Sequence, residues 1–204
     1  MEKACVKTGI MGGTFNPIHN GHLILANTAY KTLGLDKVLF IPSGNSYMKK
    51  NVLETKKRVD MVRLAIAKYP QFELSLVEAD RKGKSYTSET LAYLTKENPN
   101  TCYFFIMGAD SFFQIEKWHQ PEKIFSLAKI VCTVRDDYGI DKIRQKGQQL
   151  SKLGAEVLYL DMPKIEISST DIRAKVKKQL SISAEVPAEV ADYIQRERLY
   201  YEEN

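Results

Sequence analysis

The stretch that decides the fold is residues 4–33, which reads ACVKTGIMGGTFNPIHNGHLILANTAYKTL. A short apolar run ends at Gly12-Gly13, polar turn residues follow, and a helical spacing of apolar residues begins near Asn20. Gly34 suits the left-handed conformation that often ends a helix, and residues 37–41 form another apolar run. The sequence therefore predicts a strand, a glycine turn, a helix and a second strand, which together make a βαβ unit.

The same alternation continues to the end of the chain. Further helices are predicted at residues 56–69, 88–96 and 140–153, further strands at 72–77, 102–107, 129–134 and 156–160, and two helices close the chain. Helices that alternate with short hydrophobic strands favour a sheet covered on both sides. We therefore expect an α/β fold of Rossmann-like, doubly wound type, with a mostly parallel sheet and helices on both faces. Residues 1–204 are expected to form a single domain, with 168–204 as a C-terminal helical portion.

The composition is that of a folded globular protein. Of the 204 residues, 44% are hydrophobic and 27% are charged, which argues against a disordered or coiled-coil chain. The sequence has no apolar run near the roughly 18 residues needed to span a bilayer, and its start does not follow the pattern of a secretory leader. We expect a cytoplasmic protein without a membrane partner.

The cysteines and the net charge limit the classes of ligand that the sequence predicts. Cys5, Cys102 and Cys132 are widely spaced in apolar stretches, so we expect three buried small side chains and no metal ligated by the protein. The net charge is +5 and the sequence pI is about 8.9. This mild surplus suits a protein that handles phosphorylated small molecules, and the scattered basic residues predict no nucleic-acid partner.

The glycine turn is the first candidate site. In a doubly wound sheet, ligands bind beyond the carboxyl ends of the strands, where the strand order reverses. Gly12 and Gly13 allow a ligand to approach the backbone closely and expose amide groups to an anion. The sequence has neither a Walker A loop nor the Rossmann G-x-G-x-x-G at this place.

Two histidines follow the turn at the predicted start of a helix. His19 and His22 are three residues apart, so their side chains lie on one helix face near the positive end of its dipole. They would provide two titratable donors for an anion, and Gly21 would leave room for a ligand beside the helix. Solvent-exposed histidines are the ordinary alternative, and a zinc pair is disfavoured because H-x-x-H lacks the i,i+4 spacing of helical zinc motifs.

A second candidate site is the predicted helix start at residues 167–173, ISSTDIR. A single hydroxyl there would be an ordinary helix cap. Ser168, Ser169 and Thr170 exceed what one cap requires, and Arg173 follows one turn later. Hydroxyls, free amides and a guanidinium at a helix start predict a di- or triphosphate site.

These two motifs resemble the nucleotidyltransferases that carry a GGTF…HxGH segment and an ISSTxIR helix start. Within that superfamily the chain is most similar to the bacterial nicotinate-nucleotide adenylyltransferases. The additional marks extend over almost the whole chain and comprise Gly83-Lys84-Ser85-Tyr86-Thr87, residues 105–111, Trp118, residues 190–194 and Leu199-Tyr200.

The resemblance implies transfer of AMP from ATP to nicotinate mononucleotide, which gives deamido-NAD and pyrophosphate without a covalent enzyme intermediate. It implies catalytic roles for His19, His22, Thr14 and Arg173, and Mg²⁺ bound mainly through the phosphates of ATP. Nucleotide binding is implied for Gly12, Gly13, Thr14, Phe15, His22, Gly108, Asp110, Ser168, Ser169, Thr170 and Arg173. Asp110 would accept a hydrogen bond from a ribose hydroxyl, and capping of a helix is its compatible alternative.

The resemblance also implies an acceptor site. Trp118 would stack on the nicotinate ring, Tyr86 and Thr87 would surround its carboxylate, and Lys49 would bind the phosphate. An ordinary core position is the alternative for Trp118. The chain departs from the family pattern at Asn16, where Asp is usual, and at residues 46–49, where Ser-Tyr-Met-Lys replaces Pro-Pro-His-Lys.

These departures keep other functions open. The same chemistry on nicotinamide mononucleotide or phosphopantetheine is the nearest alternative. A nucleotide-binding regulator without turnover is a second, and a nucleic-acid-binding module, suggested only by the pI, is a third.

A homo-oligomer is compatible with the sequence. The basic cluster of Lys49, Lys50, Lys56, Lys57 and Arg58 could assist at the altered loop, although a solvated helix face is the default for most of its members.

Overall fold

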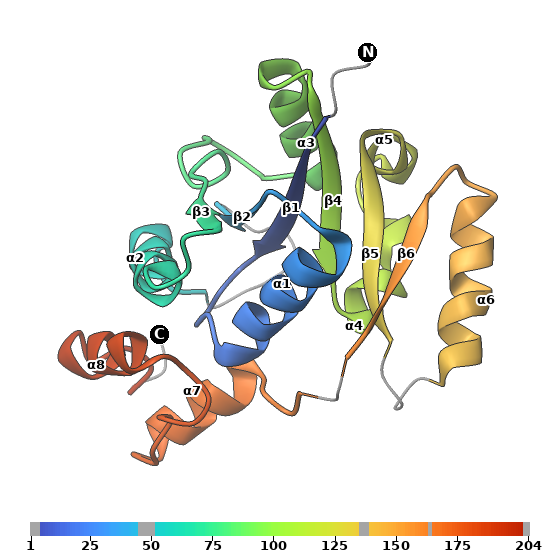
Figure 1. The fold of residues 1–204 in the computed structure, drawn as a ribbon. Coiled ribbons are helices and arrows are strands. Elements are labelled where there is room, and N and C mark those ends of the chain that lie inside the picture. Colours follow the sequence, from blue (N-terminus) through green and yellow to red (C-terminus); the bar gives the residue numbers. More distant parts are fainter. Residues whose placement is uncertain (1–4, 45–51, 135–138, 163–164, 202–204) are drawn as a thin grey trace.

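The computed structural model describes residues 5–44, 52–134, 139–162 and 165–201. Within these ranges, six strands form one sheet in the order β3-β2-β1-β4-β5-β6, and every pairing is parallel (Figure 1). The strands are β1 Val6–Gly13, β2 Lys37–Pro42, β3 Phe72–Leu74, β4 Thr101–Met107, β5 Ala128–Val134 and β6 Val157–Asp161. The order reverses between β1 and β4, which confirms the doubly wound fold and places the expected ligand crevice at their carboxyl ends.

Helices cover both faces of this sheet, as predicted. One core contains side chains of α1 (Asn20–Leu33), α2 (Thr55–Ile66), α7 (Ser169–Lys177) and α8 (Ala188–Arg196). The other contains side chains of α3 (Thr87–Glu97), α4 (Ala109–Phe112), α5 (Pro121–Leu127) and α6 (Ile140–Ser151). Strand β4 shows the division, because Phe104 and Ile106 belong to the first core and Phe105 and Met107 to the second.

The element boundaries differ from the sequence predictions in several places, and the helix predicted at 140–153, for example, ends at Ser151. The strand predicted at 72–77 ends at Leu74, and the chain then turns and runs across the carboxyl end of the sheet towards α3. The helix predicted at 56–69 ends at Ile66. The chain between β4 and β5 adds α4, the 3₁₀-helix η1 (Ile115–Lys117) and α5. Gly34 ends α1 with φ of 58°, in the left-handed conformation that the sequence predicted.

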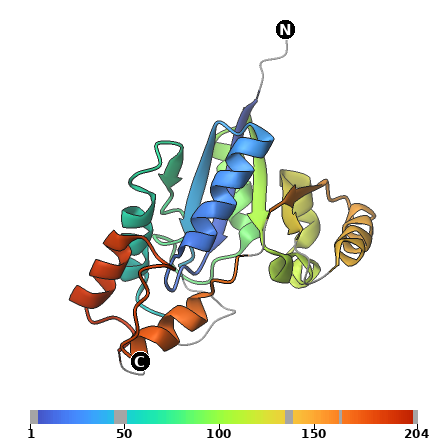
Figure 2. The same cartoon turned by 60° about the horizontal axis from the view of Figure 1, so that its bottom comes forward.

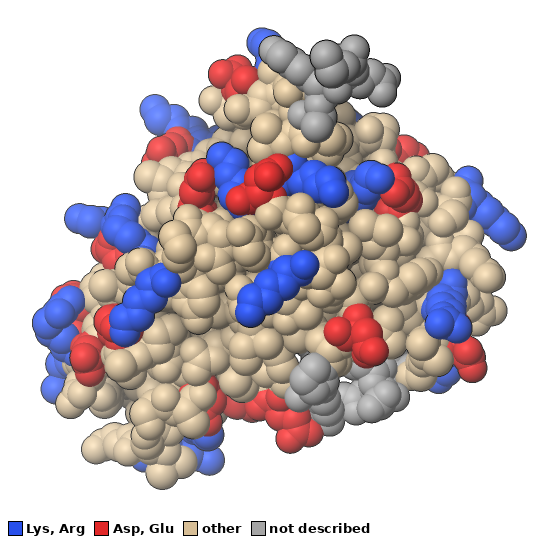
Figure 3. All heavy atoms as spheres, viewed as in Figure 1, with Lys and Arg blue, Asp and Glu red and all other residues tan. Residues whose placement is uncertain are grey.

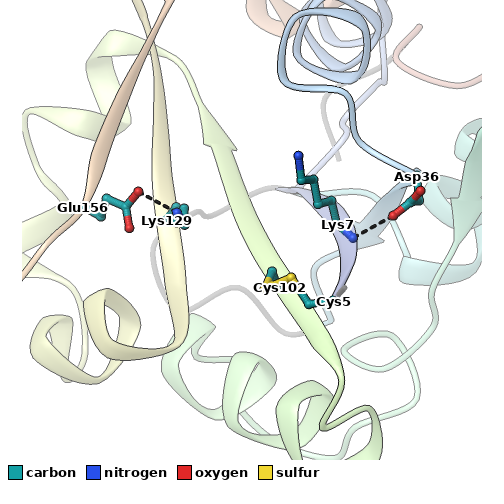
Figure 4. The surroundings of a disulfide bond; sticks show 6 residues. All are labelled: Cys5, Lys7, Asp36, Cys102, Lys129 and Glu156. Atoms are coloured by element: carbon teal, nitrogen blue, oxygen red, sulfur yellow. Dashed lines mark hydrogen bonds and ion pairs between the residues drawn. A yellow bond between two sulfur atoms is a disulfide. The ribbon is translucent and has the colours of Figure 1, made fainter. Parts of the chain in front are cut away.

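The expectation of three unpaired buried cysteines is wrong for two of them. Cys5 and Cys102 form a disulfide with a Cα–Cα distance of 5.8 Å (Figure 4). The parallel register pairs Lys7 with Cys102, which brings two residues that are 97 positions apart to the amino ends of adjacent strands. Sequence spacing gave no signal of this pairing, because it follows from the sheet order. Cys132 is buried, as expected, and does not belong to this disulfide.

The surface carries both signs of charge. On the face drawn in Figure 3, basic and acidic side chains are interspersed over a largely uncharged surface. Of the helices that the structure describes, none combines the length and the apolar character required to cross a membrane. Likewise, the described residues contain no group of three or more His, Cys, Asp or Glu side chains suited to a metal ion.

Candidate functional site

A cavity of about 500 Å³ lies at the carboxyl ends of β1, β2 and β4. It is bounded on its other sides by the start of α3, by α4 and by the segment after η1. Its position coincides with the reversal of strand order, where an α/β sheet offers a ligand site. Six residues predicted from the sequence line it: Gly12, Gly13, Thr14, Thr87, Asp110 and Trp118.

The predicted histidine pair lies at the start of α1. It follows the cavity-lining residue Thr14 in the sequence but is not part of the cavity lining. The two imidazole rings are stacked, with their centroids 3.7 Å apart, and the backbone N–H of His19 donates to Nδ1 of His22 at 3.2 Å. A Cβ at Gly21 would lie 3.0 Å from Nδ1 of His19 and 3.3 Å from Ile165. Gly21 therefore makes room for the His19 ring, whereas the sequence suggested room for a ligand.

The His19 imidazole is buried, with 8% of the residue exposed. Burial lowers the pKa of His19 to about 4, so the ring is neutral near neutral pH. Its Nδ1 atom is also buried and has no hydrogen-bond partner among the described residues. The expectation of two titratable donors is therefore corrected for His19, which offers the site a neutral imidazole.

The second predicted helix start meets the same loop. Ser169 Oγ donates to the carbonyl of Pro17 at 2.8 Å, and Arg173 Nη1 donates to the carbonyl of Asn16 at 2.8 Å. These contacts join positions more than 150 residues apart, and Figure 2 shows α7 beside the amino-terminal end of α1. The structure thus brings the two sequence motifs together at one end of the sheet.

Hydroxyl groups at this helix start have two separate roles. Ser168 Oγ caps α7 by accepting from the backbone N–H of Asp171 at 3.1 Å, and it donates to the carboxylate of the same residue at 2.6 Å. Thr170 is exposed, and its Oγ1 accepts from Arg173 Nη2 at 3.4 Å. Ser168 is therefore an ordinary helix cap, and the hydroxyls of Ser169 and Thr170 are not needed for capping, as the sequence indicated.

The remaining predicted nucleotide residues have varied environments. Phe15 is buried at 2% exposure, and its ring edge contacts His22 with centroids 5.1 Å apart, so its side chain belongs to the core. Gly108 directly precedes α4, and Asp110 lies in the first turn of that helix. Lys49 and the altered segment 46–49 lie outside the described residues.

On the acceptor side, Trp118 is half-buried and lines the cavity, so it is not simply a core residue. Its indole meets Phe105 edge-on, with centroids 6.0 Å apart. Thr87 begins α3 and also lines the cavity, while Tyr86 contacts the ring of His119 at a centroid distance of 4.3 Å. Trp118 and Thr87 therefore line one cavity, whereas Tyr86 lies outside the lining and contacts it through His119.

Sequence reasoning missed three residues here. His119 lines the cavity directly after Trp118. Glu78 also lines it, accepts a hydrogen bond from Thr90 Oγ1 at 2.8 Å, and has a pKa that burial raises above its usual value. Arg58, which we assigned to a basic cluster with a solvated face as its default, is only 1% exposed. Adjacency to Trp118 was a usable signal for His119, whereas the other two depend on tertiary packing.

The strand order and the two helix starts that meet at its reversal point define a nucleotide-binding α/β protein of the nucleotidyltransferase class. Residues 10–175 match the cytidylyltransferase-like family. The proteins named probable nicotinate-nucleotide adenylyltransferase from Lachnoclostridium phytofermentans and Clostridium tetani are each 42% identical to this chain over 197 residues, which cover 95% of this chain and 98% of the relative. The chain therefore belongs to the cytidylyltransferase-like family and, within it, to the nicotinate-nucleotide adenylyltransferases.

Solved structures agree on the fold. The nicotinic acid mononucleotide adenylyltransferase of Plasmodium falciparum, complexed with NaAD, superimposes with a TM-score of 0.79 at 21% identity, covering 97% of this chain and 98% of the other. The same protein complexed with APC gives a TM-score of 0.76. A structure from Vibrio parahaemolyticus, named a putative nicotinate-nucleotide adenylyltransferase, gives a TM-score of 0.68 at 23% identity. At these identities the comparison establishes the arrangement of the elements.

Proposed function

We propose that this protein transfers AMP from ATP to nicotinate mononucleotide and releases pyrophosphate, forming deamido-NAD. The observation that carries the proposal is the meeting of the His19–His22 and Ser168–Arg173 helix starts on the loop Asn16–Pro17, beside a cavity lined by Trp118. The names of the relatives at 42% identity support the same reaction.

In this reaction, an oxygen of the acceptor phosphate forms a bond to the α-phosphorus of ATP. The bond from that phosphorus to the oxygen bridging to the β-phosphate breaks, and the electron pair leaves with pyrophosphate. Such a transfer requires positioning and charge stabilisation, with no covalent chemistry by the protein. His22 and the neutral His19 would donate to the α-phosphate, and Thr14 would assist them. Ser168, Ser169, Thr170 and Arg173 would bind the phosphates that leave.

Of the remaining proposed ligand contacts, Gly12, Gly13, Asp110, Thr87 and Trp118 line the cavity, and the others are assigned by the family resemblance. Gly12, Gly13, Gly108 and the Phe15 backbone would approach the nucleotide, and Asp110 would accept from a ribose hydroxyl. For the acceptor, Trp118 would stack on the pyridine ring, Tyr86 and Thr87 would surround its carboxylate, and Lys49 would bind its phosphate. The 500 Å³ cavity is large enough for a mononucleotide.

Mg²⁺ would be held mainly by the phosphates of ATP, because the described residues contain no cluster of metal-ligating side chains, and Asp110 and hydroxyl groups of the cavity lining would offer further oxygen donors. When bound, it would neutralise phosphate charge. A cytoplasmic location and assembly into a homo-oligomer belong to the same proposal.

The test is pyrophosphate release from ATP and Mg²⁺ in parallel reactions with nicotinate mononucleotide, nicotinamide mononucleotide and phosphopantetheine. We expect clear preference for nicotinate mononucleotide, because the cavity combines an indole with hydroxyl groups at a helix start. Preference for another acceptor would correct the substrate. Binding of ATP without release in any reaction would favour a nucleotide-binding regulator.

A further inference from the structure

Among the residues that the structure describes, Arg58 is the largest fully buried side chain, and it lies in the first turn of α2. Its guanidinium contacts five hydrogen-bond acceptors. Nε donates to the carbonyl of Leu53 at 2.9 Å, and Nη1 donates to the carbonyl of Thr14 at 2.7 Å. Nη2 has two protons and shares them among three acceptors, namely the carbonyls of Ser43 and Gly44 at 2.7 and 3.2 Å and Thr55 Oγ1 at 2.9 Å.

These acceptors come from three separate parts of the site. Thr14 follows β1, Ser43 and Gly44 follow β2, and the other two lie at the start of α2. Thr14 and Ser43 both line the cavity, so the guanidinium lies directly behind its wall. A Cβ at Gly44 would lie 2.2 Å from the carbonyl oxygen of Glu78, so the segment that Arg58 contacts through Gly44 also packs closely against Glu78.

The positive charge of Arg58 is buried without a negative group beside it among the described residues. All five acceptors are neutral, and no carboxylate among the described residues pairs with it. Burial lowers the pKa of Arg58, although the guanidinium group stays protonated in proteins. A buried cation without a counter-charge is costly for the folded protein. An anion bound in the adjacent cavity would reduce that cost.

We propose that Arg58 is a positioning residue for adenylyl transfer, which holds the Thr14 and Ser43 peptides in the cavity wall and whose charge is offset by substrate phosphates. The proposal rests on the proposed function. A lysine could supply the charge but not the geometry, because one ammonium group cannot reach carbonyls that surround a planar fork.

Two substitutions separate these contributions. Arg58→Lys keeps the charge and loses the fork, and Arg58→Gln loses both. Arg63→Lys is the matched control, since Arg63 is an exposed residue of the same helix whose partner is Asp60 at 2.7 Å. Each variant is assayed for kcat, for KM of both substrates, for the Kd of inorganic pyrophosphate and for the midpoint of thermal unfolding.

We expect Arg58→Lys to lower kcat at least about 20-fold while the Kd of pyrophosphate changes less than about threefold, because the wall is displaced but the charge remains. Arg58→Gln should in addition weaken pyrophosphate binding at least about tenfold. The control should match the wild type. The proposal is overturned if folded Arg58→Lys and Arg58→Gln both keep wild-type kcat and pyrophosphate affinity.

Two further outcomes are informative. If the wild type releases no pyrophosphate with any acceptor, the proposed function fails, while pyrophosphate binding still tests the charge of Arg58. If neither variant folds, Thr55→Val removes one acceptor of Nη2 with little change in shape. We then expect kcat of the folded variant to fall about three- to tenfold, and an unchanged kcat would contradict the proposal.

Discussion

At the amino ends of the strands, the Cys5–Cys102 disulfide links β1 to β4, and the exposed ion pair Lys129–Glu156 lies at the same end (Figure 4). A second exposed ion pair, Lys37–Glu73, joins β2 to β3. At the carboxyl ends, by contrast, Arg58 is buried against neutral acceptors and His19 Nδ1 is buried without a partner among the described residues. The amino ends therefore carry the disulfide and solvated ion pairs, and the carboxyl ends carry a buried cation and the buried His19 ring. A buried hydroxyl without a partner among the described residues, Thr8 Oγ1, also lies near the amino end of β1.

This difference between the two ends of the strands indicates that the protein gives up stability at the carboxyl ends, where the proposed active site lies. Exposed ion pairs each contribute at most about 1 kcal/mol, and they add no ligand site. A buried polar atom without a partner costs about 1–3 kcal/mol, and such groups concentrate at functional sites. Changes at the carboxyl ends should therefore act on catalysis, and changes at the amino ends on stability.

The largest effect on catalysis is expected at His22. His22→Ala should lower kcat about 100- to 1,000-fold, because it removes a donor from the reacting phosphate, while the free energy of unfolding changes little. Steady-state kinetics and urea unfolding of the same preparation measure both quantities. Wild-type turnover in this variant would place the chemistry elsewhere.

Acidification should destabilise the carboxyl end through His19. Its pKa of about 4 in the folded state lies below the value of 6.5 expected when unfolded, so the unfolded chain gains the proton first as the pH falls. Stability should therefore be constant above about pH 6.5 and decline towards pH 4, by about 3 kcal/mol in total. His19→Gln should lack this component, as urea unfolding near neutral pH and near pH 5 would show. Identical pH dependence in both proteins would refute the assignment.

A smaller effect is expected at the acceptor side of the cavity. Trp118→Ala should raise the KM of nicotinate mononucleotide about tenfold with little change in kcat, because stacking contributes to binding in ground and transition states alike. Trp118→Phe is the control that keeps an aromatic face and should retain most of the affinity. An unchanged KM in Trp118→Ala would return this residue to a purely structural role.

The smallest effect on catalysis is expected at the disulfide. Replacing Cys5 and Cys102 by Ser should lower the free energy of unfolding by about 2–5 kcal/mol, whereas kcat and KM should stay within about twofold of the wild type. The reason is position, since both cysteines lie at the end of the sheet opposite the cavity. A large loss of turnover in the folded double variant would break the division between the two ends.

The sequence predicted the fold well because its signals are local. Apolar runs, Gly34 and the glycine turn after β1 each report on a few neighbouring residues, and the helix starts at His19 and Ser168 carry their motifs intact. Local patterns also gave a wrong end for β3. The apolar residues 76 and 77 continue the apolar run, so a strand over 72–77 was predicted, but only the three residues 72–74 pair with β2.

The site was predicted less completely, because several of its features depend on tertiary contacts. Lys56, Lys57 and Arg58 form one basic run, yet only the third is buried, where carbonyls from two strand ends converge. The burial of His19 depends on packing around Gly21, and the Cys5–Cys102 pair depends on strand order. The spacing of residues in the sequence does not predict these contacts.

The central claim is that adenylyl transfer takes place at the carboxyl end of the sheet. The most direct test is pyrophosphate release with ATP and nicotinate mononucleotide, measured side by side for the wild type, His22→Ala and the Cys5, Cys102 double variant. We predict full turnover in the wild type, near-complete loss in His22→Ala and near-wild-type turnover in the double variant. Equal turnover in the wild type and His22→Ala would contradict the account.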